Sequence, residues 1–153
     1  MEPNRSLMTF SFPAPQILID GQWREAGGGQ TLPVEDPSTG ETFARIAAGT
    51  PQDVDAAVAA ARAALDGEWG AMPAFERGRI LARIGHAVLE QIDYLAHLEA
   101  RDVGKPLKQA RADVVALARY LEFYAGAADK IHGETIPFQA GYTVYTLREP
   151  HGV

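Results

Sequence analysis

A long amphipathic stretch between Pro106 and Gly133 constrains the fold of this chain more than any other part of its sequence. Proline favours the first position of a helix, and glycine favours the position just after its end. Between these two residues, apolar side chains recur at spacings of three and four, the period of one helix face. They are Leu107, Ala110, Val114, Leu117, Leu121, Tyr124, Ala128 and Ile131. The stretch therefore predicts one helix that is roughly 40 Å long, against which the preceding elements pack.

Short strands joined by turns are predicted before this stretch. Asp20 and Gly21 separate two short apolar-containing runs, and this pair is a strong signal for a tight hairpin turn because it tolerates positive φ. Residues 32–35 and 41–47 are predicted strands on either side of a turn at residues 36–40. The consecutive glycines 27–29 lack the G-x-G-x-x-G spacing of a phosphate-binding loop, so we interpret them as a flexible loop.

Three helices are predicted between the strands and the long stretch. The first has Thr50 as its N-cap and Asp53 as an acid near its positive end, and it ends at residues 66–67. The second begins at Pro73, and the third has Asp93 as its N-cap and Gly104 just past its end. The apolar residues expected to face the core are Val54, Val58, Ala61, Leu65, Phe75, Leu81, Ile84, Val88, Leu95 and Leu98.

The two ends of the chain suggest how it is divided. Residues 1–15 contain Pro3, Pro13 and Pro15 and no long apolar run, so we expect a flexible arm without a signal peptide. Residues 16–140 would form the main body. Within residues 141–153, positions 142–147 alternate as a strand does, and the sequence then stops without a polar tail. We therefore expect a truncated chain.

The composition excludes several kinds of site. The 153 residues include no cysteine, so a disulfide, a thiolate metal site and a cysteine nucleophile are all impossible in this chain. A net charge of −6 argues against nucleic-acid binding, and no apolar run reaches the 20 or so residues of a membrane helix. The four histidines show no H-E-x-x-H spacing, and no serine lies in a G-x-S-x-G elbow. We expect a soluble cytoplasmic protein.

Three weaker patterns each have a structural interpretation that we prefer to a functional one. Arg77, Arg79 and Arg83 could form an anion patch, but a solvated helix face is the better interpretation in an acidic chain. Gly104-Lys105 lacks the upstream glycine and the following Ser/Thr of a phosphate loop. Asp93 and His97 are spaced for a local helix contact rather than for catalysis. By residues alone, the chain is an acidic α+β segment without a complete active site.

Four blocks of sequence carry a more specific pattern. They are residues 19–23 (IDGQW); residues 36–41 (DPSTGE) with 53–58 (DVDAAV) and 77–81 (RGRIL); residues 98–106 (LEARDVGKP); and residues 124–126 (YAG) with 132–137 (HGETIP) and 148–153 (REPHGV). In this order and spacing, the blocks resemble the N-terminal part of the aldehyde dehydrogenase superfamily. The resemblance covers the chain from about Ile17 to its last residue.

The resemblance implies an α/β fold with a Rossmann-like cofactor domain. This chain would be an α+β N-terminal part of that fold, with short N-terminal strands, four helices and one C-terminal oligomerisation strand. The implied enzyme is an oxidoreductase that converts an aldehyde to a carboxylic acid with NAD or NADP. In the family, a cysteine forms a thiohemiacetal, hydride passes to the nicotinamide, and a glutamate activates the water that releases the acid. The resemblance places these residues and the cofactor-binding residues outside this chain, which we expect to be inactive alone.

Some family roles can be assigned to matching positions. Ala112 and Ala116 match positions near the substrate tunnel, and their small size implies a roomy tunnel mouth; core packing is the alternative interpretation. Asp102, with the backbone carbonyls of Val34 and Glu35, matches a monovalent-cation site of some members; for Asp102 a loop carboxylate at a helix end is the alternative. Residues 142–150 match a strand that pairs subunits, so we expect a homodimer or homotetramer of the complete enzyme.

A second class of function stays open from the sequence. The apolar stripe between Pro106 and Gly133 could seek a partner coiled coil, which would make the chain a non-catalytic helical interaction module. The capped helices upstream argue against this alternative because they could cover the stripe within the same chain. The break at residues 104–106 also stops the pattern from extending further.

Overall fold

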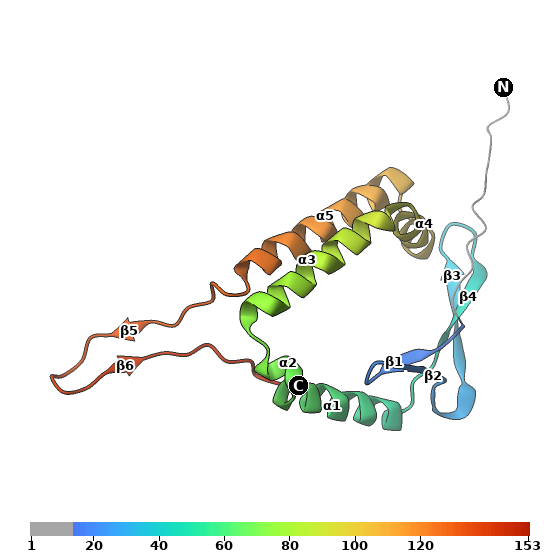
Figure 1. The fold of residues 1–153 in the computed structure, drawn as a ribbon. Coiled ribbons are helices and arrows are strands. Elements are labelled where there is room, and N and C mark those ends of the chain that lie inside the picture. Colours follow the sequence, from blue (N-terminus) through green and yellow to red (C-terminus); the bar gives the residue numbers. More distant parts are fainter. Residues whose placement is uncertain (1–13) are drawn as a thin grey trace.

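Two antiparallel helices form the centre of the computed structural model, which describes residues 14–153. Helix α3 (Ala74–Glu90) lies beside α5 (Leu107–Ala127), and α4 (Ile92–Val103) packs against one end of the pair (Figure 1). Two small hairpins lie beyond α4. They are β1 (Ile17–Ile19) with β2 (Gln22–Arg24), and β3 (Thr31–Asp36) with β4 (Glu41–Ala47). Helix α1 (Pro51–Asp66) and the short α2 (Glu68–Ala71) connect these hairpins to α3. The four predicted helices and the short N-terminal strands are therefore present.

The two hairpins follow the turn signals of the sequence. In β1–β2, Asp20 and Gly21 have φ values of 52° and 70°, and Leu18 lies opposite Trp23. In β3–β4, the backbone N–H of Ser38 donates to Asp36 Oδ1 at 2.8 Å, which holds the intervening turn. A register shift between Val34 and Glu35 makes a β-bulge in β3. Both predicted turns are confirmed.

Small residues make the contact between α3 and α5. Ala110, Val114 and Ala118 are the buried residues of α5, and Gly78 and Gly85 are the buried residues of α3. A Cβ placed on Gly78 would lie 2.5 Å from the carbonyl oxygen of Ala125, so the two backbones are almost in contact there. The predicted stripe is therefore right for Ala110 and Val114. It is wrong for Tyr124, which is 60% exposed, because the close approach of the helices selects small side chains.

Helix α5 ends earlier than predicted. Its last residue is Ala127, so it is about 32 Å long rather than 40 Å, and Ile131 lies outside it. After the helix the chain turns outward and its backbone pairs with the returning segment. The backbone N–H of Thr146 donates to the carbonyl of Glu134 at 2.9 Å. Directly after the helix, the backbone N–H of Lys130 donates to the carbonyl of Ala127 at 2.9 Å, so a turn replaces the last predicted residues of the helix.

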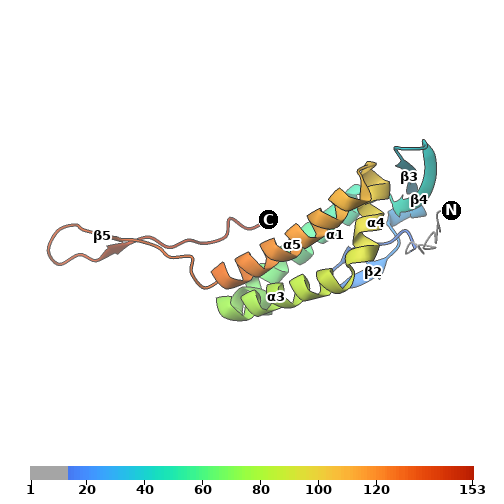
Figure 2. The same ribbon diagram turned by 90° about the horizontal axis from the view of Figure 1, so that it is seen from above.

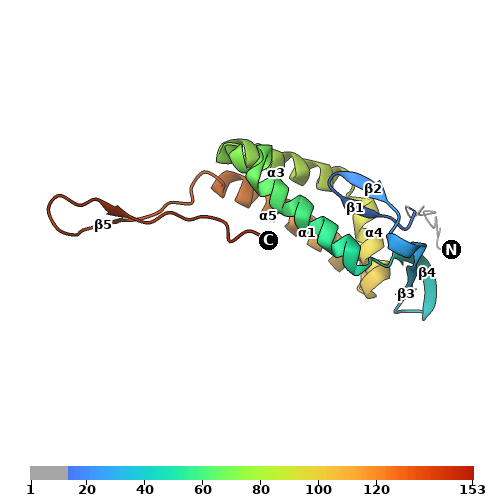
Figure 3. The same ribbon diagram turned by 90° about the horizontal axis from the view of Figure 1, so that it is seen from below.

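Helix α1 does not bury the face that its sequence predicts. It has no buried residue, and Val54 on that face is 58% exposed. It packs mainly against α2 and β1, whereas α3 and α4 are the helices that contact α5. The views in Figures 2 and 3 show α1 running along one side of the assembly. The expectation that all three preceding helices pack on α5 is therefore wrong, because no facing element of this segment covers α1. Phe75 and Ile84 of α3, also predicted to be buried, are exposed as well.

The C-terminal segment forms a projecting arm rather than one isolated strand. Strands β5 (Thr135–Ile136) and β6 (Val144–Tyr145) pair in antiparallel register, with Thr135 opposite Tyr145. Figures 1 and 2 show this ribbon extending away from the helices, after which the chain returns toward α1. Arg62 of α1 donates to the carbonyl of Val153 at 3.4 Å. The predicted strand over residues 142–147 is thus shorter than expected, and it pairs with a partner that the sequence reading missed.

The helices of the described segment, residues 14–153, include none that combines the length and the apolar character needed to cross a bilayer.

Replacing Gly78 by alanine tests the glycine contact between α3 and α5. The added methyl would meet the Ala125 carbonyl at 2.5 Å, so we expect Gly78→Ala to lower the free energy of unfolding by about 1–3 kcal/mol. Gly126→Ala is the matched control, since its added Cβ meets nothing within 4 Å and alanine favours a helix. Urea unfolding monitored by circular dichroism measures both. Equal midpoints for the two variants would contradict the close contact.

Candidate functional site

The predicted cation ligands lie where β3 meets α4. Val34 and Asp102 both line a cavity of about 340 Å³ whose wall also includes Trp23, Tyr94 and Leu98. Glu35 is exposed and is not among the described residues that line this cavity. The structure thus brings two of the three predicted residues to one cavity. The bulge at Val34 and Glu35 lies at the same place in β3.

An arginine holds α4 against the β3–β4 hairpin beside this cavity. The guanidinium of Arg101 lies 4.4 Å from the centre of the Phe43 ring and 3.5 Å from Asp36 Oδ2. A cation over an aromatic face is attracted to the ring, and the ion pair adds to this attraction. Gly104, with φ of 70°, ends α4 so close to the Pro37 ring that an added Cβ would meet it at 2.9 Å. These contacts fix the end of α4 that carries Asp102.

The donor set at this cavity suits a hard cation only in part. Within residues 14–153, no three His, Asp or Glu side chains converge as they would around a divalent metal. A cation beside Asp102 would need backbone carbonyl oxygens, such as those of Val34 and Glu35, to complete its shell. Such oxygens suit hard cations and place no demand on side-chain type, which is why the sequence alone cannot identify them.

Ala112 and Ala116 lie one turn apart on α5. Ala112 is exposed and Ala116 is half-buried. Both are about half a turn away from Ala110 and Val114, which pack with Ala96 of α4. They are also about a third of a turn or more from Ala118, which faces Gly85 of α3, so their face is turned away from both contacts. This arrangement does not support the interpretation of these alanines as part of the packed core of this segment.

Lys105, which lies just before α5, binds two carboxylates. The sequence did not predict this cluster. Lys105 Nζ donates to Glu99 Oε1 and to Asp113 Oδ2, the latter at 2.8 Å, and Gln109 Nε2 donates to Asp113 Oδ1 at 3.0 Å. The hydrogen bonds to Asp113 and then to Glu99 raise the pKa of Lys105. The bonds from Lys105 and then from Gln109 lower the pKa of Asp113. The only sequence pattern at this position is the Gly104-Lys105 pair, which does not match a phosphate-binding loop.

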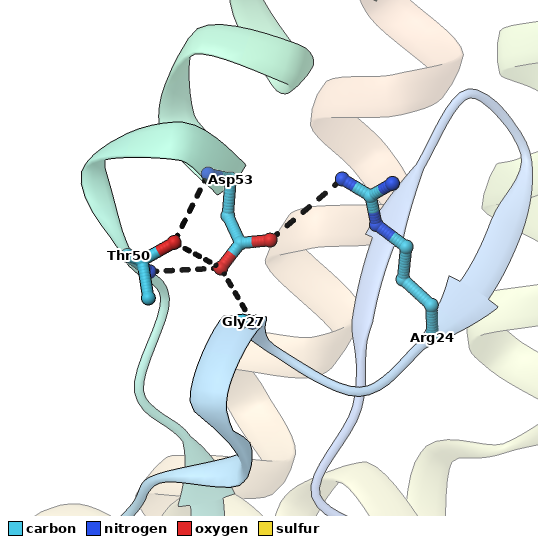
Figure 4. Close-up of polar contacts among 4 residues, drawn as sticks. All are labelled: Arg24, Gly27, Thr50 and Asp53. Atoms are coloured by element: carbon cyan, nitrogen blue, oxygen red, sulfur yellow. Dashed lines mark hydrogen bonds and ion pairs between the residues drawn. The ribbon is translucent and has the colours of Figure 1, made fainter.

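Asp53 joins three elements at the start of α1 (Figure 4). Its Oδ2 accepts hydrogen bonds from the backbone N–H of Gly27 at 2.9 Å, the backbone N–H of Thr50 at 2.8 Å and the Thr50 hydroxyl at 2.8 Å. Arg24 Nη2 lies 3.7 Å from Asp53 Oδ1. The sequence predicted the cap by Thr50 and Asp53 but not Arg24 or Gly27. Residues Gly27–Gly29 form a 3₁₀ turn tied to this carboxylate, so the flexible-loop interpretation is wrong.

Two of the three arginines considered for an anion patch on α3, Arg77 and Arg79, have separate partners within the chain. Arg77 donates to the carbonyl of Met72, whereas Arg79 binds Glu76 Oε1 at 2.7 Å and lies over the Phe75 ring.

Asp93 and His97 are in contact, but through the backbone of Asp93 rather than through its carboxylate. His97 Nδ1 lies 2.7 Å from the backbone carbonyl of Asp93, and the Asp93 carboxylate binds Arg111. Asp93 lies in the first turn of α4, whose N-cap is Gln91.

Comparison with known proteins gives a consistent result. The model of the aldehyde dehydrogenase family matches residues 23–153. A mitochondrial aldehyde dehydrogenase, family 2 member B4 of Arabidopsis thaliana, is 46% identical over 140 residues, covering 90% of this chain and 26% of the relative. A crystal structure from Burkholderia cenocepacia, described as an aldehyde dehydrogenase, has 62% identity and a TM-score of 0.85, covering 88% of this chain and 28% of the other.

A third comparison includes a bound cofactor. The NAD+ complex of an aldehyde dehydrogenase from Bacillus cereus has 36% identity and a TM-score of 0.86, covering 90% of this chain and 28% of that chain. This chain therefore spans between a quarter and a third of the length of the proteins it matches. The likeness concerns the whole described arrangement of helices and hairpins.

Acid titration tests the Asp53 network. The backbone N–H of Thr50, the strongest of its partners, lowers the pKa of Asp53 below its usual 3.8. A lowered pKa in the folded state stabilises the fold above the usual value, and this stabilisation is lost as the pH falls through the folded value. We expect Asp53→Asn to lower the urea midpoint at neutral pH, and its difference from the wild type to shrink below about pH 4.

Asp55→Asn is the matched control for this titration, because Asp55 is an exposed acid on the same helix. We expect it to leave the urea midpoint nearly unchanged across the same pH range. A constant difference between wild type and Asp53→Asn at every pH would show that the carboxylate charge does not stabilise the start of α1.

Proposed function

The chain belongs to the aldehyde dehydrogenase family, and from this membership we propose that it is the N-terminal segment of an enzyme that oxidises an aldehyde to a carboxylic acid with NAD or NADP. The family match over residues 23–153 is the observation that carries the proposal. The likeness to an NAD+ complex supports a nicotinamide cofactor without separating NAD from NADP. As the family model covers residues 23–153, the proposal concerns the described fold except β1 and the residues next to it.

The chemistry of such an enzyme would come from parts outside this segment. A cysteine nucleophile would form the thiohemiacetal, the cofactor would take the hydride, and a glutamate would activate water. This chain contains no cysteine. Its own contribution is therefore proposed to be architectural: it would form one wall of the substrate passage and one edge of a subunit interface.

Helix α5 is proposed to supply the wall of the passage. Ala112 and Ala116 lie on the face that is turned away from α3, where they could approach a substrate without disturbing the packed contact. The cavity beside Val34 and Asp102 supports the proposed monovalent-cation site, with the carbonyl of Glu35 as a further ligand. Because the cation would bind at the β3–α4 contact, its proposed role is to stabilise that contact.

The β5–β6 arm is proposed to pair with another subunit in a homodimer or homotetramer. A two-stranded ribbon is marginally stable by itself in water, and this one exposes large apolar side chains. Phe138 and Tyr142 pack edge to face, yet each is 67% exposed. Burial against a second chain would remove this surface from water. With this role, residues 141–153 would be the start of an oligomerisation segment and residues 16–140 part of the cofactor-binding domain.

Three remaining expectations differ in their support. The cytoplasmic location stays a prediction, and the curated relative from Arabidopsis thaliana is mitochondrial. The alternative function as a helical interaction module loses its main argument, since α3 and α4 already pack against the buried residues of α5 within this chain. The predicted arm at residues 1–15 lies, except for its last two residues, outside the described range.

The chain alone should not oxidise aldehydes. Purified chain mixed with NAD+ or NADP+ and acetaldehyde is expected to produce no NADH or NADPH, because no cysteine is present to attack the aldehyde. The absorbance of NADH or NADPH measures the rate of aldehyde oxidation. The full-length enzyme under the same conditions is the positive control. Turnover by the pure 153-residue chain would contradict the proposal that the catalytic residues lie outside this segment.

Enlarging Ala116 tests the proposed passage. In the full-length enzyme, Ala116→Phe is expected to lower kcat/KM for a bulky aromatic aldehyde about tenfold or more while changing that for acetaldehyde little, because only the larger substrate would meet the ring. Steady-state kinetics with both aldehydes measures the selectivity. Ala57→Phe, at an exposed position of α1, is the control. Equal losses for both aldehydes would contradict a passage beside Ala116.

A further inference from the structure

Lys105 stands alone between two helix ends. Gly104, in the left-handed conformation, ends α4, and Pro106 is the N-cap of α5. The short connection leaves this part of the backbone little freedom, because proline fixes its own φ and restricts the residue before it. Gly104 also approaches Pro37 of the β3–β4 turn. Lys105 is therefore placed where three elements meet.

The ammonium group of Lys105 ties the two helices together. It binds Glu99 in α4 and Asp113 in α5, and its side chain is only 27% exposed. Gln109 holds the other oxygen of Asp113, so this carboxylate is fixed from two sides. Hydrogen bonds between charged groups are stronger than neutral ones, and partial burial reduces their screening by water. The cluster therefore resists rotation of α5 against α4.

Asp113 lies beside the face that carries Ala112 and Ala116. It precedes Ala116 by three positions, and helix residues at this spacing are neighbours on the surface. Together with Leu117, Asp113 lines a hollow of about 420 Å³ between α4 and α5. The carboxylate that Lys105 neutralises is thus the acidic group of α5 nearest in sequence to the proposed passage.

We propose that Lys105 is a positioning residue that sets substrate selectivity in the complete enzyme. It fixes Asp113 and the adjoining turns of α5, and it neutralises a carboxylate next to the face of Ala112 and Ala116. Without Lys105, both Glu99 and Asp113 would lose their counter-charge, and the more negative cluster would repel an aldehyde that carries its own carboxylate. This inference rests on the proposed function, in which Ala112 and Ala116 border the substrate passage.

The test compares two aldehydes in the full-length enzyme. One carries a terminal carboxylate, and the other is a neutral aldehyde of the same chain length. We expect Lys105→Met to lower the ratio of kcat/KM for the charged aldehyde to that for the neutral one by about fivefold, mainly through KM, since ground-state binding is affected. Lys108→Met is the matched control. Lys108 is an exposed lysine on the same helix outside the cluster, so its removal should leave the ratio unchanged.

A second substitution separates this charge effect from general damage to the fold. Adding Asp113→Asn to Lys105→Met should restore the ratio toward the wild-type value, because the net charge of the cluster with Glu99 is then the same as in the wild type. Asp113→Asn alone keeps Lys105 and should raise the ratio, so the proposal stays testable even if Lys105→Met fails to fold. Failure of the double substitution to restore the ratio would overturn the assignment, as would an equal change with Lys108→Met.

The outcomes also distinguish this inference from the proposed function. No aldehyde oxidation by the wild-type enzyme would overturn both. Normal oxidation, with the expected effect of Ala116→Phe but an unchanged ratio in Lys105→Met, would overturn only the role of Lys105.

Discussion

The close contact between α3 and α5 is the constraint on which the rest of the structure depends. Gly78 and Gly85 let the backbone of α3 approach α5 at Ala125 and Ala118, and Ala110 and Val114 continue this packing beside Ala96 of α4. Small residues bury little apolar area each, so this core gains stability from close packing rather than from large side chains. Its residues are also few, and helix α4 extends it through Ala96. The β3–β4 hairpin is positioned from this helical unit through the contact of β3 with α4.

Polar contacts at the ends of elements position what the small core does not cover. Asp53 joins the start of α1 to the glycine turn and to Arg24. Arg101 holds the β3–β4 hairpin to α4, and Lys105 joins α4 to α5. Each contact links segments distant in the sequence or helices that meet at a sharp turn. Because these groups are partly exposed, they determine orientation more than they add stability.

Apolar surface remains uncovered on several elements of the segment. Val54 on α1, Tyr124 on α5 and Phe138 on the arm are all largely exposed. Some exposed side chains contact one another, as Phe123 does Tyr124 and Phe138 does Tyr142. Contiguous exposed apolar surface marks sites that bind other protein segments. The relatives are more than three times as long as this chain, which covers 26% of one of them. The proposed enzyme would cover these faces with its remaining domains and with a second subunit.

The sequence by itself determined the local structure, because local signals depend on neighbouring residues. It predicted the Asp20-Gly21 turn, the Thr50–Asp53 cap, the αL residue Gly104 and the helices, and its motifs identified the family. Only the tertiary structure decided which helix faces are buried, that α5 stops at Ala127, and that Lys105 joins Glu99 to Asp113. These features depend on which backbones approach one another across the fold. Helical periodicity identifies an apolar face, but it cannot show whether a neighbour with glycines will pack there or whether any neighbour exists.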